Sequence, residues 1–151
     1  MTINHDFKKF PELKNEQLAE LEFISPHPQI KESFFATVIK VSDGDTIRVV
    51  TNFRDFSFPV RLLDINAPEM NEGGQTAQKW LESRILNKKV EVLVNPKNRV
   101  GKFGRLLGKV LSDGLDIGTE MLALGLVRVF GQPVGGAFDN PDKTFDLKKW
   151  F

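Results

Sequence analysis

The 151-residue sequence contains no cysteine and no tyrosine, and its two histidines, His5 and His27, both lie near its beginning. The absence of cysteine excludes disulfide bonds, thiolate metal sites and cysteine nucleophiles. The position of the histidines makes a Ser-His-Asp triad or a histidine zinc site a poor hypothesis for the rest of the chain. The chemistry must therefore rely on carboxylate, amide, guanidinium, amine and hydroxyl groups. Oxygen ligands of this kind favour hard cations such as Ca²⁺ or Mg²⁺.

The sequence also lacks an apolar run approaching the roughly 18 residues of a membrane span, so we expect no membrane association. Its first residues show no basic segment followed by an apolar one. We therefore expect no secretory signal and an intracellular location, and a secreted form made from a processed precursor stays open.

Hydrophobic residues make up 40% of the chain and charged residues 27%, which is typical of a folded protein with one core. The formal net charge is +1, but residues 88–109 hold seven basic residues against one acidic residue. A basic stretch on a near-neutral protein indicates an anionic partner bound by one face. Taken alone, it is more typical of an ordinary solvated surface.

The chain divides into three parts by residue pattern. Residues 1–33 are expected to form an N-terminal extension, partly helical, that packs on the main domain; a helix is expected within residues 11–24, with Asn15 as its cap. Residues 34–130 are expected to form the main domain. Residues 131–151, rich in Gly, Pro and Asp, are expected to form a C-terminal tail packed on that domain.

Within the main domain, alternation and β-branched residues predict strands over residues 34–40, 45–51, 56–65, 90–95 and 105–111. Helical spacing predicts a helix over residues 75–86. A second helix is expected after Asp116, with Ile117, Met121 and Leu124 facing inward and Gly125 ending it. This order favours an α+β fold, mainly β, in which a five-stranded OB-type barrel carries two helices. A fold of this class does not specify an activity.

Three polar segments stand out: Asp43-Gly44-Asp45-Thr46, the run RLLDINAPE over residues 61–69, and Lys102-Phe103-Gly104-Arg105. Individually they are typical of a hairpin turn, a strand exit and a basic turn. In this order and spacing they resemble the staphylococcal nuclease (thermonuclease) family, whose pattern is D-G-D-T, then R-x-x-x-x-D-x-P-E, then D-K-Y-G-R on an OB-type barrel. The resemblance covers about residues 34–130. It implies a metal-dependent nuclease that hydrolyses phosphodiester bonds in DNA, RNA or both.

The resemblance also assigns roles to individual residues. Arg61 and Arg105 match the family's phosphate-binding arginines, and a planar guanidinium suits this role because it can bind two phosphate oxygens. Glu69 matches the residue that acts as general base or orients the attacking water. Lys102 and Phe103 stand where substrate-contacting residues are expected, and Phe103 keeps the stacking face of a tyrosine without its hydroxyl.

The metal that the resemblance implies is one divalent cation, Ca²⁺ first, with Mg²⁺ or Mn²⁺ as alternatives. Asp45 matches one carboxylate ligand, Asn66 stands where the second is expected, and Ala67 would supply its backbone carbonyl. Asp43 and Thr46 would support this metal loop.

Asn66 is the departure from the family pattern with most consequence. An amide oxygen can bind Ca²⁺ but brings no charge, so we expect weaker metal binding or a changed metal preference. Asp64 lies two residues earlier, but strand alternation places it on the side of Leu62 rather than that of Arg61. We therefore do not expect Asp64 to compensate.

Two other functions stay open. One is an OB-fold module, catalytically weak or inactive, that binds single-stranded nucleic acid; the other is an interaction domain whose two terminal segments contact a partner protein. We expect a monomer that binds DNA or RNA. The sequence names no protein partner, and no base-reading side chain can be identified in it.

Overall fold

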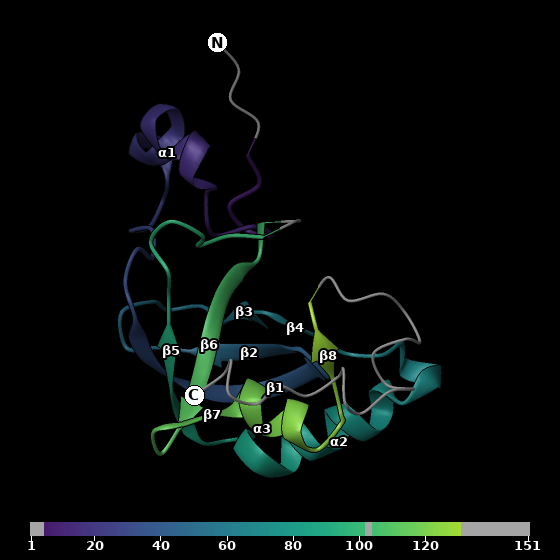
Figure 1. The fold of residues 1–151 in the computed structure, drawn as a ribbon. Helices are drawn as coiled ribbons and strands as arrows, with labels where there is room; N and C mark the ends of the chain where they lie inside the picture. Colours follow the sequence, from purple (N-terminus) through teal and green to yellow (C-terminus); the bar gives the residue numbers. More distant parts are fainter. Residues whose placement is uncertain (1–4, 102–103, 131–151) are drawn as a thin grey trace.

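The computed structural model describes residues 5–101 and 104–130, and its centre is a closed β-barrel (Figure 1). The barrel strands are β1 (Phe34–Asp43), β2 (Thr46–Val50), β3 (Phe58–Leu62), β5 (Lys89–Leu93) and β6 (Leu106–Ser112). They follow the order β3-β2-β1-β5-β6, with antiparallel neighbours, and the parallel pairing of β3 with β6 closes the barrel. This arrangement, with its helices, confirms the predicted α+β fold with an OB-type barrel.

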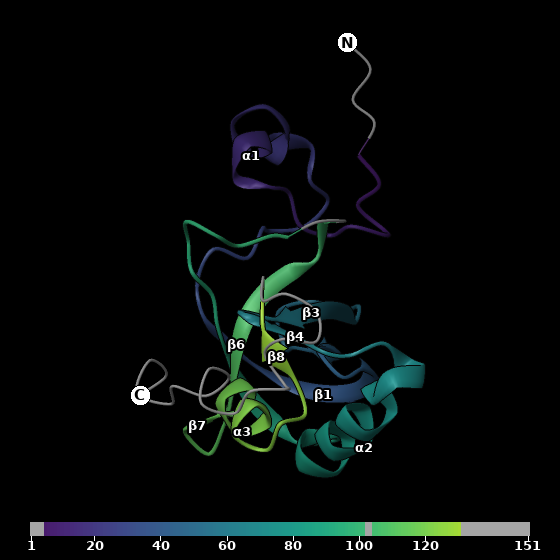
Figure 2. The same cartoon turned by 45° about the vertical axis from the view of Figure 1, so that its right-hand side comes forward.

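Short elements complete the domain. The strand β7 (Leu115–Asp116) pairs in antiparallel orientation with the end of β6. The strands β4 (Ile65–Asn66) and β8 (Arg128–Val129) form a separate two-stranded pair. A 3₁₀ turn, η2 (Met70–Glu72), leads into the helix α2 (Gly74–Ile85). Figures 1 and 2 show α2 and the helix α3 (Ile117–Ala123) at the same end of the barrel.

The predicted third strand, residues 56–65, is wrong at its end. The strand β3 stops at Leu62, and Asp64 adopts a left-handed conformation with φ of 67° before β4 begins. An extended strand cannot continue through such a residue. The chain instead turns here, so that β4 can pair with β8.

The predicted helix over residues 75–86 corresponds to α2, and the predicted cap of α3 is confirmed. The Asp116 carboxylate accepts a hydrogen bond from the Thr119 N–H at 3.3 Å. The inward position predicted for Leu124 is wrong, because α3 ends at Ala123 and the Leu124 side chain is 59% exposed. Leu122 is buried in its place.

The N-terminal helix α1 (Asn15–Leu21), followed by the 3₁₀ turn η1 (Glu22–Ile24), lies within the predicted range. Asn15 is not its cap. The capping position belongs to Lys14, whose backbone N–H donates to the Gln17 side-chain oxygen at 3.0 Å. The Asn15 amide instead donates to the Pro96 carbonyl at 2.9 Å, between β5 and β6.

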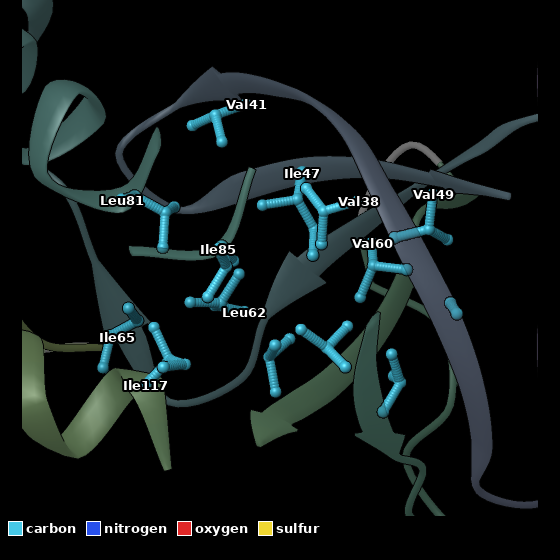
Figure 3. Packing of buried hydrophobic residues seen from close by; sticks show 14 of the residues in the cluster. Val38, Val41, Ile47, Val49, Val60, Leu62, Ile65, Leu81, Ile85 and Ile117 are labelled. Carbon is cyan, nitrogen blue, oxygen red and sulfur yellow. The ribbon is translucent and has the colours of Figure 1, made fainter. Parts of the chain in front are cut away.

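The hydrophobic core fills the barrel and continues under α2 and α3. Figure 3 shows Val38, Ile47 and Val60 from three barrel strands close to one another, with Leu81 and Ile85 of α2 covering one end. These side chains are fully buried. Burying an aliphatic side chain of this size stabilises the fold by about 2 kcal/mol.

Residues 5–33 lie at the other end of the barrel, beside the loop between β5 and β6 (Figures 1 and 2). Five of these residues are buried, namely Pro11, Glu12, Leu13, Gln29 and Ile30. The predicted C-terminal tail, residues 131–151, lies outside the described residues. None of the helices in the described ranges is long and apolar enough to cross a membrane.

Candidate active site

A polar cavity of about 240 Å³ lies where the β1–β2 turn, the end of β3, β4 and the start of β6 meet. It gathers acidic and basic side chains from segments that are far apart in the sequence. Its lining residues are Asp43, Asp45, Arg61, Asn66, Ala67, Pro68, Glu69, Met70 and Arg105. All the site residues proposed from the sequence lie at this cavity or contact it, except Lys102 and Phe103, which fall outside the described residues.

The β1–β2 turn places Asp45 at the cavity. Asp43 pairs with Thr46 across the hairpin, so Gly44 and Asp45 form the turn itself, and β2 begins one residue later than predicted. The Asp43 carboxylate accepts a hydrogen bond from the Asp45 N–H at 3.0 Å, which fixes the turn. A side chain at Gly44 would clash, since a Cβ there would lie 2.8 Å from the Cβ of Ala67. The glycine therefore lets the turn pack directly against the segment after β4.

The Asp45 carboxylate is buried and surrounded by donors. It accepts hydrogen bonds from the Ala67 N–H at 2.8 Å and the Thr46 hydroxyl at 3.1 Å, and it pairs with Arg61 at 3.3 Å. Burial raises the pKa of Asp45 to about 6, helped by the neighbouring Asp43, while the Ala67 N–H and Arg61 act in the opposite direction. A buried carboxylate with a raised pKa in a cleft is typical of functional sites.

The Arg61 guanidinium is held against the turn that follows its own strand. Its Nη1 donates to the carbonyls of Leu62 and Ile65 at 2.7 and 2.8 Å, and its Nη2 donates to the Asn66 side-chain oxygen at 3.2 Å. Arg61 is only 9% exposed, and this burial lowers its pKa from the usual value, although Asp45 counteracts the effect. Arg61 therefore both shapes the turn over residues 62–66 and presents positive charge to the cavity.

Asp64 does not line the cavity. It is exposed, and its left-handed backbone turns it out of the strand, so the alternation from which its position was predicted does not apply. Its carbonyl accepts a hydrogen bond from the Phe130 N–H at 2.8 Å, which attaches the segment after β8 to this turn. Asp64 therefore supplies no carboxylate to the site.

Arg105 and Glu69 both line the cavity. Arg105 lies immediately before β6, and its Nη1 donates to the Thr46 hydroxyl at 3.3 Å. Thr46 therefore bridges Arg105 and Asp45. Glu69 lies at the start of η2, where its carbonyl accepts hydrogen bonds from the N–H groups of Glu72 and Gly74 at 2.8 and 2.9 Å. This tight turn fixes its backbone at the rim, and Glu69 itself is exposed to solvent.

Two residues beside the cavity were missed by the sequence reasoning, which treated residues 127–130 only as a short apolar piece. Arg128 on β8 pairs with Asn66 on β4, and the Arg61 guanidinium lies 5.9 Å from the centre of the Phe130 ring. Phe130 is 66% exposed, so a large aromatic side chain is exposed to solvent close to Arg61. The sequence does contain a signal for this strand, because Val127 and Val129 alternate with Arg128 and Phe130, and β-branched residues at every second position are typical of a strand with one face toward the core.

The donor chemistry of the cavity fits a hard divalent cation, since the Asp45 carboxylate and the Asn66 amide oxygen lie 3.3 and 3.2 Å from the same Arg61 nitrogen, Nη2. The carboxylates of Asp43 and Glu69 line the same cavity. Among the described residues, however, no three Asp, Glu, His or Cys side chains are grouped as a preformed metal site.

Comparisons with known proteins identify the family of this chain. The family model described as staphylococcal nuclease homologue matches residues 59–144. An uncharacterized endonuclease of Escherichia coli O157:H7 is 30% identical over 112 residues, covering 73% of this chain and 70% of that protein. An uncharacterized endonuclease of Haemophilus influenzae is 32% identical over 103 residues, covering 68% of this chain and 56% of that protein. A probable endonuclease, LCL3, of Paracoccidioides lutzii is 28% identical over 162 residues, covering 83% of this chain and 46% of that protein. The residues matched by the family model include the end of β3, Glu69 and Arg105. This chain belongs to the staphylococcal nuclease homologue family.

Proposed function

We propose that this protein is a nuclease that hydrolyses phosphodiester bonds in DNA, RNA or both. The observation that carries the proposal is one cavity lined by two arginines, Arg61 and Arg105, and by the carboxylates of Asp45 and Glu69. A site that only binds nucleic acid gives no reason to place an exposed carboxylate beside phosphate-binding arginines. The names of the relatives, which include the word endonuclease, support cleavage within a strand.

In the proposed reaction, a water oxygen attacks the phosphorus atom and the bond to the leaving oxygen breaks. Glu69 orients the water and accepts its proton, and solvent supplies a proton to the leaving oxygen. Arg61 and Arg105 donate hydrogen bonds to the phosphate oxygens, which gain negative charge in the transition state. Thr46 and Asp45 hold the two guanidinium groups in place.

We further propose that the site uses one divalent cation, Ca²⁺ first and Mg²⁺ or Mn²⁺ as alternatives. Asp45, Asn66 and the Ala67 carbonyl would hold it. Such a cation neutralises phosphate charge and lowers the pKa of a bound water. Because Asn66 is neutral and already accepts a hydrogen bond from Arg61, we expect binding to be weak.

The second candidate is a module that binds single-stranded nucleic acid without cutting it. Asn66 favours it, because an amide replaces one of the anions that a tightly bound metal needs. Phe130 is also consistent with it, since exposed aromatic rings beside arginines are typical of base-stacking surfaces.

Cleavage of single-stranded and duplex DNA and RNA by the purified protein, with Ca²⁺, Mg²⁺, Mn²⁺ or EDTA, tests the proposal. We expect metal-dependent cleavage that is lost in EDTA. If no metal supports cleavage, yet the protein binds DNA with an affinity that falls with salt and is unchanged by EDTA, the binding module is the better interpretation.

A further inference from the structure

A buried ion cluster lies outside the cavity, at the end of the barrel covered by residues 5–33. It consists of Glu12, Arg54 and Arg99, and the side chains are 2%, 1% and 1% exposed. One Glu12 oxygen pairs with Arg54; the other accepts from Arg99 at 3.0 Å and from the Ile30 N–H at 2.9 Å. Charges this deeply buried are costly to desolvate, and the hydrogen bonds within the cluster offset part of that cost. None of these three residues lines the cavity.

Arg99 attaches the loop between β5 and β6 to the N-terminal segment. Its guanidinium donates to the Ile30 carbonyl at 2.6 Å, the Leu13 carbonyl at 2.9 Å and the Asn15 side-chain oxygen at 3.1 Å. With Glu12, every one of these partners belongs to residues 12–30. The N-terminal segment therefore encloses the side chain of a residue that belongs to the barrel loop.

The backbone around Arg99 is bonded directly to the segment that carries Arg105. The Arg99 carbonyl accepts from the Leu107 N–H at 2.8 Å, and the Gly101 N–H donates to the Arg105 carbonyl at 2.9 Å. Phe10 of the N-terminal segment packs against Gly104 in the same loop. The contact is so close that a Cβ on Gly104 would lie 2.9 Å from the Phe10 side chain. The N-terminal segment thus contacts the loop at Arg99 and at Gly104, and both positions precede Arg105 in the sequence.

We infer that Arg99, held by Glu12 and the N-terminal segment, is a positioning residue for Arg105. This inference rests on the proposed function, in which the Arg105 guanidinium must meet the phosphate in a fixed geometry. A displacement of about 1 Å in such a group can cost on the order of 10²-fold in rate. Residues 5–33 are then part of the active-site architecture of this chain, acting at a distance through the loop backbone.

Arg54 supplies a matched control. It is as buried as Arg99 and pairs with the same carboxylate, and it also donates to the Pro28 carbonyl at 3.0 Å. It lies between β2 and β3, however, and no hydrogen bond of its backbone reaches the segment of Arg105 among the bonds in the described residues. Replacing either arginine by lysine keeps the charge and removes the branched donor group. Both changes should therefore lower the stability of the fold, and only Arg99→Lys should disturb the position of Arg105.

The test compares Arg99→Lys and Arg54→Lys in the full-length chain, well below their melting temperatures. We expect Arg99→Lys to lower kcat about tenfold with little change in KM, and Arg54→Lys to leave kcat within about twofold. In an Arg105→Ala background the effect of Arg99→Lys on kcat should disappear, because the two act through the same group. Equal losses in the two lysine variants, or a full effect of Arg99→Lys without Arg105, would overturn the inference.

Two further measurements keep the test decisive. If Arg99→Lys does not fold, Phe10→Ala replaces it: a several-fold loss of kcat supports the inference, and an unchanged kcat contradicts it. If the wild type cleaves nothing, the proposed function fails by itself, and the NMR signal of the Arg105 Nε–Hε group then tests the positioning. A signal shifted by Arg99→Lys and not by Arg54→Lys supports the inference, and equal responses contradict it.

Discussion

Replacing Arg61 by alanine should damage both the fold and the activity, whereas replacing Arg105 should damage mainly the activity. Arg61 is 9% exposed and donates to two main-chain carbonyls and one side-chain amide in the turn over residues 62–66. Its loss leaves those carbonyls without their donor, at about 1–3 kcal/mol for each buried group. It also leaves the buried Asp45 carboxylate without its partner at 3.3 Å. We expect a total of roughly 3–5 kcal/mol, the usual cost of breaking a buried pair.

Urea unfolding in EDTA measures this difference without interference from a bound metal. For a chain of this size, a loss of that magnitude lowers the melting temperature by roughly 10 °C. Arg105→Ala should change the free energy of unfolding by less than about 1 kcal/mol, as is usual for a residue that is not deeply buried. Both variants should lose on the order of 10²-fold or more in kcat, the usual effect of removing a transition-state donor. Equal stability losses, or an Arg61→Ala variant as stable as the wild type, would refute the reasoning.

Three further predictions concern the metal, pH and one glycine. Asn66→Asp should tighten Ca²⁺ binding about tenfold or more, because the ligand gains a charge; calorimetry checks this, and submicromolar binding by the wild type would contradict the weak-site account. Burial and the charge of Arg54 lower the pKa of His27, so the fold favours its neutral form. The free energy of unfolding should therefore fall as pH falls below about 6.5, where the unfolded state takes up the proton first. Urea titrations at several pH values should show a smaller pH dependence of this free energy in His27→Gln than in the wild type. Gly104→Ala should lower the melting temperature and kcat, since Gly104 has φ of 72° and a Cβ there would clash with Phe10. Thermal denaturation and a cleavage assay check this, and an unchanged melting temperature with unchanged kcat would contradict it.

The barrel and most of the cavity could be predicted because their signals are local. Alternating strands and helical spacing are read within a few residues, and the ordered motifs around Asp45, Arg61 and Glu69 indicate which turns meet. The turn at Asp64 was harder to predict from the sequence, since an aspartate does not require a left-handed backbone. The inward position of Leu124 failed because it depended on the last turn of a helix, where boundaries are least certain.

The ion cluster of Glu12, Arg54 and Arg99 could not be predicted from local patterns. Its partners are 42 and 87 residues apart in the sequence, and each charged residue alone is typical of a solvated surface. Only the folded chain shows that they are buried together. The same holds for Arg128, whose place opposite Asn66 depends on the pairing of two strands of two residues each.

The central claim is that Glu69 acts on the attacking water while the arginines bind the phosphate. The most direct test compares wild type and Glu69→Gln for cleavage and for affinity, with a single-stranded oligonucleotide and Ca²⁺ or Mg²⁺. The account predicts that Glu69→Gln loses cleavage by about 10²-fold or more and keeps its affinity for the oligonucleotide. Cleavage at the wild-type rate in Glu69→Gln would contradict it.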